Sequence, residues 1–374
     1  MKRRADGRSS WCTIRSSRPE SSASLAANSN DGQRPHRTRR PSSSTGASWT
    51  WAETLELTRR AAAGLAHLGV QKGDHVLSWQ PNNREAVLTW FGLNYLGAVY
   101  VPMNIAYRGS LLEHTIDLSD ATLMVCHADL APRLADIDTG ALTDVVLTGG
   151  AGAVPSLDLA ELTLHTAESL LPAVGLTAMP VDIDPWDPQY IIFTSGTTGP
   201  SKAVLSSYLQ GYSMGPDAHS YLGSDERHLV NLPLFHVGGT IFLVLTLATG
   251  APAVIDTHFK TDEFWDTVRK HEVTATCLLA AMIPFLLKLP PSNDERDHTL
   301  RRAICVPWNE DAMAVGRRYG IELRTTFNMT EVSSPMVSEP FPRSPVPVGR
   351  FVRASRPGWS TRTTARSPPA RLGS

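Results

Sequence analysis

The sequence predicts an α/β fold in which largely parallel sheets are flanked by helices. First, helical patterns and short apolar strands alternate between residues 49 and 125, as is typical of parallel βα units. Second, short apolar runs at 190–193, 274–279 and 303–306 are typical of buried parallel strands. Third, 374 residues with 42% hydrophobic and 19% charged residues suffice for one large or two medium-sized globular domains.

The elements of the first half can be placed in order. Apolar residues from Trp51 to Leu68 recur on one helical face, and Gly69 ends this helix. The turn Lys72-Gly-Asp74 leads into a strand. The expected order is a strand at 75–78, a helix over 84–96, a strand at 98–101, a helix over 109–118 and a strand at 123–125.

The stretch from Leu229 to Ile255 contains no Asp, Glu, Lys or Arg and is long enough to cross a bilayer. It is interrupted, however, by residues such as Pro233, Gly238 and Pro252, which break a spanning helix. We therefore expect a strand, a loop, a buried helix over 240–248 and a second strand, and no membrane span.

The net charge of −1 hides an uneven distribution. Residues 1–47 carry ten Lys/Arg against three Asp/Glu, and residues 351–374 carry five against none. Neither end has an apolar helical stripe or interleaved aromatic residues, so we expect disordered tails rather than segments that bind nucleic acid or membrane. The expected folded domain is the acidic middle, 48–350.

The four cysteines have neither disulfide nor metal-ligand spacing; they are Cys12, Cys126, Cys277 and Cys305. No apolar run at the N-terminus indicates a signal peptide. We therefore expect reduced cysteines and a cytoplasmic location. The sequence does not indicate an oligomeric state.

The central motif is Tyr190-Ile-Ile-Phe-Thr194-Ser-Gly-Thr-Thr-Gly-Pro-Ser-Lys202. Its four apolar residues predict a buried strand, and Gly196 and Gly199 allow the following loop to approach a ligand closely. Backbone N–H groups, the charge of Lys202 and four hydroxyls suit a phosphate; the hydroxyls belong to Thr194, Ser195, Thr197 and Thr198. The Walker pattern fails on both sides of Lys202, and an ordinary polar turn is the alternative reading.

A second motif is Asn231-Leu-Pro-Leu-Phe-His236-Val-Gly-Gly239. His236 can donate or accept a proton near neutral pH, and two glycines beside it leave room for a ligand. By itself, a lone histidine in an apolar run is also typical of a hydrogen-bonded core residue.

A third motif is Thr325-Thr-Phe327-Asn-Met-Thr330-Glu331. A strand expected at 321–326 would deliver Thr330 and Glu331 at its end, where α/β sheets bind ligands. A carboxylate beside a triphosphate would hold Mg²⁺, which prefers oxygen ligands. By itself, Thr-Glu is equally a helix start.

These motifs resemble those of the adenylate-forming superfamily, which includes acyl-CoA synthetases, luciferases and peptide-synthetase adenylation domains. The 194–202 loop is similar to its TSGTTGxPKG signature, with Ser201 for the usual proline and Ala203 for the usual glycine. Residues 49–76 resemble its opening helix and strand, and 97–104 resemble its GAVxVPlN turn. The likeness covers about 48–350 and implies the large N-terminal domain of that fold, with stacked, largely parallel sheets.

The resemblance also implies roles for individual residues. The nucleotide would be held by Thr194, Ser195, Gly196, Thr197, Thr198, Gly199, Lys202, Phe327, Asn328 and Thr330. Lys202, Thr330 and Glu331 would be catalytic, with Glu331 on Mg²⁺ and Phe327 near the adenine. The acid would be enclosed by His236, Val237, Gly238, Gly239 and Asn328. Asn328 replaces the usual glycine and would narrow the pocket, and His236 would form its wall rather than act as a general base.

The reaction that the family performs joins a carboxylic acid, ATP and CoA. A carboxylate oxygen attacks the α-phosphorus, pyrophosphate leaves, and the thiol of CoA displaces AMP from the acyl-adenylate. The run from Ala303 to Asn309 resembles the carnitine/crotonobetaine-CoA ligase branch, although the acid itself is not indicated.

The two ends of the chain depart from this family. We expect the small C-terminal domain of the family to be absent, because residues 351–374, like 1–47, resemble translation in a shifted frame. Such a chain is expected to be weakly active or inactive. Two alternatives stay open: a ligand-binding remnant without catalysis, and a ligase that transfers the acyl group to an acceptor other than CoA.

Overall fold

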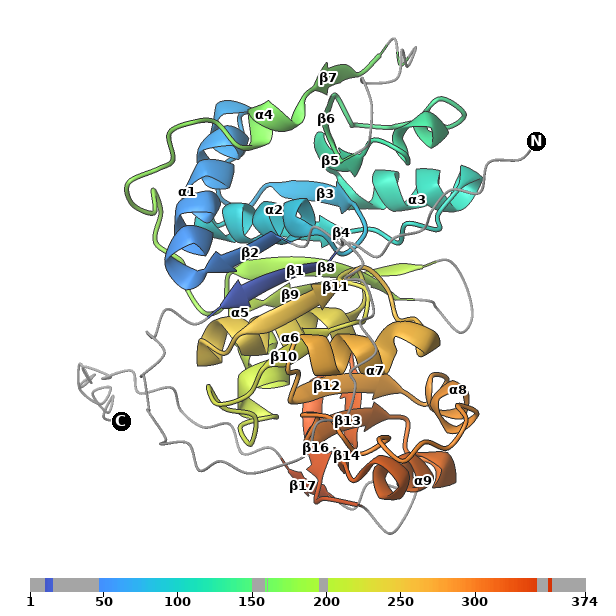
Figure 1. Ribbon diagram of the computed structural model, residues 1–374. Helices are drawn as coiled ribbons and strands as arrows, with labels where there is room; N and C mark the ends of the chain where they lie inside the picture. Colours follow the sequence, from blue (N-terminus) through green and yellow to red (C-terminus); the bar gives the residue numbers. More distant parts are fainter. Residues whose placement is uncertain are drawn as a thin grey trace, which may run out of the picture.

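The structure is a computed structural model that describes residues 11–15, 47–149, 159, 161–194, 201–341 and 349–351, with the backbone alone for 11–15, 47 and 349–351. These residues form two seven-stranded sheets and one three-stranded sheet. The two large sheets lie one above the other, with the small sheet beside the lower one (Figure 1). The predicted α/β class and the stacked, largely parallel sheets are confirmed.

The first large sheet has the strand order β7-β6-β5-β3-β4-β8-β9. All its neighbours pair in parallel except β8 and β9. Its strands are β3 (His75–Trp79), β4 (Val99–Pro102), β5 (Leu123–His127), β6 (Asp144–Thr148), β7 (Thr163–His165), β8 (Pro188–Thr194) and β9 (Lys202–Ser207).

The second large sheet has the strand order β14-β13-β12-β10-β11-β1-β2, and only β1 and β11 pair antiparallel. Its strands are β1 (Trp11–Arg15), β2 (Ala47–Thr50), β10 (His228–Val230), β11 (Ala253–Asp256), β12 (Ala275–Leu279), β13 (Arg302–Val306) and β14 (Glu322–Arg324). The antiparallel third sheet contains β15 (Thr326–Met329), β16 (Ser333–Ser338) and β17 (Gly349–Phe351).

Helices fill the space between the large sheets and cover their outer faces. Between the sheets lie α1 (Trp51–His67), α2 (Arg84–Tyr95) and α6 (Val237–Thr249), which share one apolar core. The outer face of the first sheet packs against α3 (Gly109–Ser119), and that of the second against α7 (Thr261–Lys270) and α9 (Glu310–Tyr319). Short helical turns occur at α4 (Ala167–Leu170), α5 (Tyr208–Tyr212), α8 (Ile283–Leu287), η1 (Ala131–Leu134) and η2 (Ser213–Asp217).

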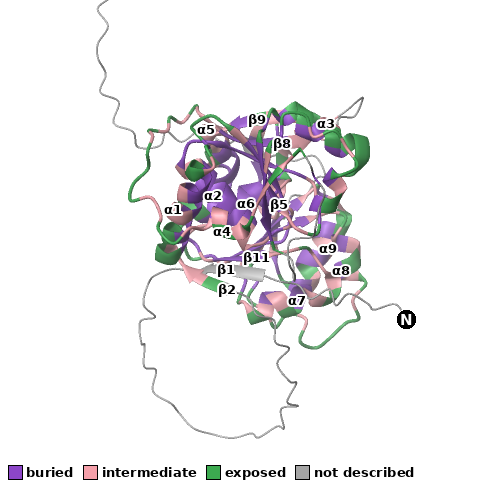
Figure 2. Cartoon of the chain, turned by 90° about the horizontal axis from the view of Figure 1, so that it is seen from above, coloured by how far each residue is buried: buried purple, intermediate pink, exposed green. Residues whose placement is uncertain are grey.

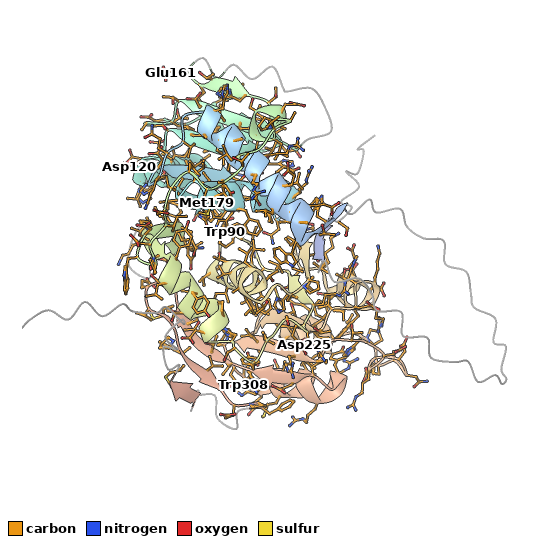
Figure 3. All side chains as sticks on the ribbon, turned by 90° about the vertical axis from the view of Figure 1, so that its left-hand side faces the viewer. Trp90, Asp120, Glu161, Met179, Asp225 and Trp308 are labelled. Carbon is orange, nitrogen blue, oxygen red and sulfur yellow. The ribbon has the colours of Figure 1, made fainter. Side chains whose placement is uncertain are left out.

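The central core explains why the two sheets stay together. Trp90 of α2 is fully buried; its ring stacks on Tyr100 with centroids 5.1 Å apart and meets the edge of Tyr190 at 6.1 Å. In Figure 3 its label lies between the upper and lower halves of the ribbon. Figure 2 shows α2 and α6 as largely buried helices near the centre of the molecule. This packing fixes β4 and β8 against α2, which shares its apolar core with α6.

Local sequence signals set the helix ends. Thr50 Oγ1 accepts a hydrogen bond from the Glu53 N–H at 3.1 Å, and the Glu53 carboxylate accepts one from the Thr50 N–H at 2.7 Å. This reciprocal capping box starts α1. Asn83 caps α2 with its side chain alone, accepting from the Ala86 N–H at 2.8 Å.

Three elements differ from the sequence-based expectations. The strand expected at 321–326 is divided at Thr325, where Ser338 accepts from and donates to the backbone of Thr325 and draws the chain into the small sheet. The helix expected over 240–248 begins at Val237. A strand also lies at Trp11–Arg15, where no regular structure was assigned, because its backbone pairs with β11 and β2.

Within the residues described, no helix is both long and apolar enough to cross a membrane. The uncharged stretch that raised this question is divided into β10, the 13-residue helix α6 and β11.

Candidate active site

A cavity of about 700 Å³ opens where the carboxyl ends of strands from both large sheets meet. Ligands of α/β sheets bind at such strand ends. Its walls come from β4, β8, β9, α6, β12, β13 and β15 and from the segments that follow several of them. The cavity therefore lies between the sheets rather than on one of them.

One end of the cavity is polar, and the β8–β9 hairpin forms part of it. Thr194, the last residue of β8, and Lys202, the first of β9, are cross-strand partners, and both line the cavity. Lys202 is exposed and makes no ion pair with any side chain in the described ranges. The other predicted loop residues, Ser195, Gly196, Thr197, Thr198 and Gly199, lie outside the residues that the structure describes.

The turn after β15 completes this polar end. Thr330 is buried and Glu331 is exposed, and both line the same cavity as Thr194 and Lys202. The Thr330 carbonyl accepts a hydrogen bond from Gln210 Nε2 of α5 at 2.7 Å, which ties the turn to the helix that follows β9. The four cavity residues Thr194, Lys202, Thr330 and Glu331 are called the polar end below.

The donor set at the polar end fits a magnesium ion that is shared with a phosphate ligand. In the described parts of the chain, no cluster of three or more His, Cys, Asp or Glu side chains could hold a metal by itself. Mg²⁺ in phosphate sites is bound by one or two carboxylates, substrate oxygens and waters. The single exposed carboxylate of Glu331 meets that requirement only together with a phosphate.

His236 lines the cavity at the start of α6. Its Nδ1 lies 3.1 Å from the backbone N of Gly238. A backbone N–H can only donate, so Nδ1 accepts and the neutral ring carries its proton on Nε2. His236 is exposed to the cavity, yet loss of solvent around the ring lowers its pKa. The ring can therefore donate a hydrogen bond from Nε2, which fits the expected role as a wall residue.

The two glycines after His236 have different structural roles: Gly238 lines the cavity and Gly239 allows close packing. Gly238 lines the cavity, and Val237 beside it is buried and also lines it. Gly239 does not line the cavity: a Cβ there would lie 2.4 Å from the Pro233 carbonyl oxygen and 2.5 Å from that of Leu232. Gly239 is therefore required for close packing of α6 against the preceding loop.

Phe327 and Asn328 of the third motif differ in whether they line the cavity. Asn328 lines the cavity, and its Nδ2 donates to Ser334 Oγ at 2.8 Å, which holds the side chain across the β15–β16 pair. Phe327 is 44% exposed and lies outside the cavity lining. Thr326 and Asn328 line the cavity and Phe327 between them does not, because neighbouring residues face opposite sides of a strand. Met329 lines it again after a register shift in β15.

A second part of the cavity is apolar, and its residues Cys277 and Ile304 lie two positions before the ends of β12 and β13. This part is formed by five buried residues: His219 after η2, Ile241 and Phe242 of α6, Cys277 of β12 and Ile304 of β13. These five residues are called the apolar end below. Burial raises the pKa of the Cys277 thiol to about 12, so this wall carries no thiolate. The three cysteines whose side chains are described, Cys126, Cys277 and Cys305, are free and buried.

Sequence reasoning missed several cavity residues. Asn104 and Tyr107 follow β4 and line the cavity; the position of Asn104 two residues after a buried strand was a usable signal. His219 also lines it. No motif surrounds His219 in the sequence, so its place in the cavity depends on how the helical segment packs.

Comparison with known proteins agrees with this arrangement. A family model described as AMP-binding enzyme matches residues 28–358. The chain belongs to this family. The match includes the β8–β9 hairpin, the start of α6 and the turn after β15, which together form the cavity.

Curated proteins of known name match this chain at low sequence identity. The chain is 29% identical over 298 residues to the crotonobetaine/carnitine–CoA ligase of Escherichia coli O9:H4 (strain HS), a match covering 76% of this chain and 55% of that protein. It thus spans about half the length of the curated relatives it matches.

Two solved structures share the fold. The N-terminal domain of FACL13 from Mycobacterium tuberculosis, solved with an inhibitor, has a TM-score of 0.64 at 22% identity, covering 77% of this chain and 71% of that one. The anthranilate CoA ligase AuaEII, solved with anthranoyl-AMP, has a TM-score of 0.67 at 18% identity, covering 80% of this chain and 59% of that one.

Proposed function

We propose that this chain binds ATP and a carboxylic acid in the cavity between its sheets and converts the acid to an acyl-adenylate. The observation that carries the proposal is the composition of one continuous cavity. Its polar end brings a lysine, two threonines and a glutamate to one place, and its other end is apolar. A charged triphosphate and the body of an organic acid need such contrasting surroundings.

The polar end would hold the phosphates. Lys202 supplies a positive charge, and Thr194 of β8 and Thr330 of the turn after β15 supply hydroxyl donors. Glu331 would hold Mg²⁺, which supplies positive charge that stabilises the departing pyrophosphate. The hairpin loop 195–200 follows Thr194 directly, and in this proposal its residues complete the phosphate site.

The acid would lie with its carboxylate toward the polar end and its body against the apolar end. One carboxylate oxygen attacks the α-phosphorus, and the bond from phosphorus to the bridging oxygen of pyrophosphate breaks. Lys202 offsets the charge that develops on the leaving group. His236 can donate from Nε2 to an oxygen of the acid or of the α-phosphate, since its Nδ1 is occupied by the Gly238 N–H.

The acceptor of the acyl group is the second part of the proposal. The Escherichia coli relative is named a CoA ligase, and a CoA thiol would displace AMP from the acyl-adenylate to give a thioester. Formation of a thioester from CoA by the purified chain tests this part separately from adenylation. AMP released only in the presence of another nucleophile would indicate a different acceptor.

Carboxylate-dependent exchange of labelled pyrophosphate into ATP tests the adenylation step. The purified chain is screened with a set of carboxylic acids, and we expect exchange only when an accepted acid is present. Lys288→Ala and Glu339→Ala serve as matched controls, because both residues are exposed and lie outside the cavity. Binding of ATP without exchange in the presence of any acid would favour a nucleotide-binding protein without catalysis.

A further inference from the structure

One polar atom at the apolar end lacks a partner. The His219 side chain is fully buried and lines the cavity. Its Nε2 has no hydrogen-bond partner among the residues that the structure describes. Leaving a buried polar atom unpaired costs about 1–3 kcal/mol, and folded proteins pair nearly all such atoms. Since the His219 residue lines a cavity, a ligand in that cavity is the candidate for the missing partner.

The other ring nitrogen fixes what kind of partner fits. Nδ1 of His219 lies 3.1 Å from the carbonyl oxygen of Gly215. A carbonyl oxygen only accepts, so Nδ1 carries the proton. Burial lowers the pKa of His219 to about 4, so the ring is neutral near neutral pH. Nε2 therefore presents a lone pair and can accept a hydrogen bond but cannot donate one.

The surroundings decide which donor can reach this atom. The other members of the apolar end are Ile241, Phe242, Cys277 and Ile304, which carry no charge and no amide. An ammonium group would lie there without a counter-ion, at a large desolvation cost. An amide N–H would bring a carbonyl oxygen that finds no donor on this wall. A hydroxyl group, small and neutral, fits best.

The position of His219 along its helical segment sets where the hydroxyl must be on the ligand. Gln210, near the start of that segment, bonds Thr330 at the polar end. His219 follows nine residues after Gln210, two residues beyond the end of η2, which corresponds to roughly 13 Å at the rise of an α-helix. Cys277 and Ile304 at the apolar end also lie two residues before the ends of β12 and β13, and both observations support placing a ligand group at Nε2 away from Thr330.

We propose that His219 selects carboxylic acids that carry a neutral hydroxyl group, alcoholic or phenolic, on the end remote from the carboxylate. The assignment of the carboxylate to the polar end rests on the proposed function above. His219 is a specificity-determining residue: it contacts the body of the acid and takes no part in the bond changes at phosphorus.

Matched pairs of acids test this inference in the wild-type chain. The pairs are benzoate and 4-hydroxybenzoate, butyrate and 4-hydroxybutyrate, and hexanoate and 6-hydroxyhexanoate. Each acid is titrated calorimetrically in the presence of AMP. For the pair whose length fits the cavity, we expect the hydroxylated acid to bind about 10-fold to 100-fold more tightly than its partner, since the partner leaves Nε2 unpaired.

Variants of His219 then test whether its Nε2 causes the preference for hydroxylated acids. His219→Leu should remove the preference, mainly by weakening the hydroxylated acid, whereas His219→Gln can place an amide oxygen near the Nε2 position and should retain part of it. His228→Leu is the matched control: His228 is also buried with an unpartnered Nε2 but lies outside the cavity lining. It should keep the wild-type preference.

The outcomes separate this inference from the proposed function. Equal binding within every pair, or binding of no hydroxylated acid by the wild type, would overturn it, and neither result depends on how well the variants fold. A hydroxyl preference that His219→Leu leaves intact would overturn it as well. A preference for hydroxylated acids in binding, without pyrophosphate exchange, would contradict adenylation but support the role of His219. Pyrophosphate exchange without such a preference would support adenylation but contradict the role of His219.

Discussion

His236 and His219 line the same cavity, but their rings are oriented by hydrogen bonds of opposite sense. Nδ1 of His236 accepts from the Gly238 N–H, and Nδ1 of His219 donates to the Gly215 carbonyl. His236 therefore offers a donor from Nε2, and His219 offers an acceptor. The difference teaches that the backbone partner of a histidine, more than its residue type, sets what it can recognise in a ligand.

The two ends of the cavity also differ, in charge and in exposure. The polar end presents exposed charged groups, Lys202 and Glu331, whereas the apolar end presents buried neutral ones. Substitutions at the polar end should therefore affect the reaction with every acid. Substitutions at the apolar end should change which acid is accepted.

The largest expected effect comes from removing charge at the polar end. Lys202→Ala and Glu331→Ala should each lower pyrophosphate exchange by at least about 100-fold with every accepted acid, since each removes charge stabilisation from the departing phosphates. Exchange rates are measured beside the Lys288→Ala and Glu339→Ala controls. If either site variant keeps wild-type exchange, its residue has been wrongly assigned to the phosphates.

The paired glycines after His236 give the next largest effect. Gly239→Ala forces a Cβ to within 2.5 Å of two backbone oxygens, whereas a Cβ at Gly238 meets the flexible end of the Leu232 side chain at 2.7 Å. Gly239→Ala should lower the free energy of unfolding by roughly 2–4 kcal/mol, and Gly238→Ala by about 1 kcal/mol.

Urea denaturation measures both glycine variants. Gly238→Ala should also weaken acid binding, because Gly238 and Leu232, which the added methyl group would displace, both line the cavity. Similar losses of stability in the two variants would contradict the distinction between a packing glycine and a cavity glycine.

The motifs predicted this site only in part. Thr194, Lys202, His236, Thr330 and Glu331 could be found from sequence because they belong to three motifs that resemble those of the adenylate-forming superfamily. Thr194 also directly follows an apolar run, and ligands bind at such strand ends. All five line the cavity. Their roles toward a nucleotide and an acid stay predictions.

Other features depend on tertiary packing that no local pattern encodes. His219 is brought to the cavity by the packing of η2 against α6 and β16. The division of β14 from β15 depends on Ser338, which lies 13 residues beyond Thr325 in the chain. Phe327 has the residue type expected of a stacking group, but the alternation along β15 places it outside the cavity lining.

The buried histidines should make stability depend on pH. Burial lowers the pKa values of His219 and His228 to about 4, against about 6.5 in an unfolded chain. The unfolded state therefore binds more protons between pH 4 and pH 6.5, so the free energy of unfolding falls as the pH is lowered through this window. Each histidine should contribute about 2 kcal/mol of this loss between pH 7 and pH 5.

Urea denaturation at pH 7 and pH 5 measures this dependence. His228→Phe should reduce the difference between the two pH values by about one histidine's share, roughly 2 kcal/mol. His236→Gln should reduce it less, because His236 is exposed to the cavity. An unchanged difference in His228→Phe would show that this histidine is not held neutral by burial.

The smallest expected effect concerns the width of the cavity. Asn328→Gly removes a side chain that lines the cavity and the hydrogen bond to Ser334. We expect larger acids to gain a few-fold in exchange rate relative to small ones, and the free energy of unfolding to fall by about 1 kcal/mol. Asn328→Ser, which retains a polar group at this position, is the comparison variant. Unchanged relative rates in Asn328→Gly would show that Asn328 does not limit the size of the acid.

The most direct test joins the two ends in one molecule. A stable acyl-adenylate analogue, with a sulfamoyl group in place of the phosphate and a terminal hydroxyl on the acyl chain, is titrated against the wild-type chain without any need for turnover. If one cavity accepts both parts, the analogue should bind at least about 100-fold more tightly than AMP or the free acid. An affinity no better than that of AMP alone would contradict the shared cavity on which the account depends.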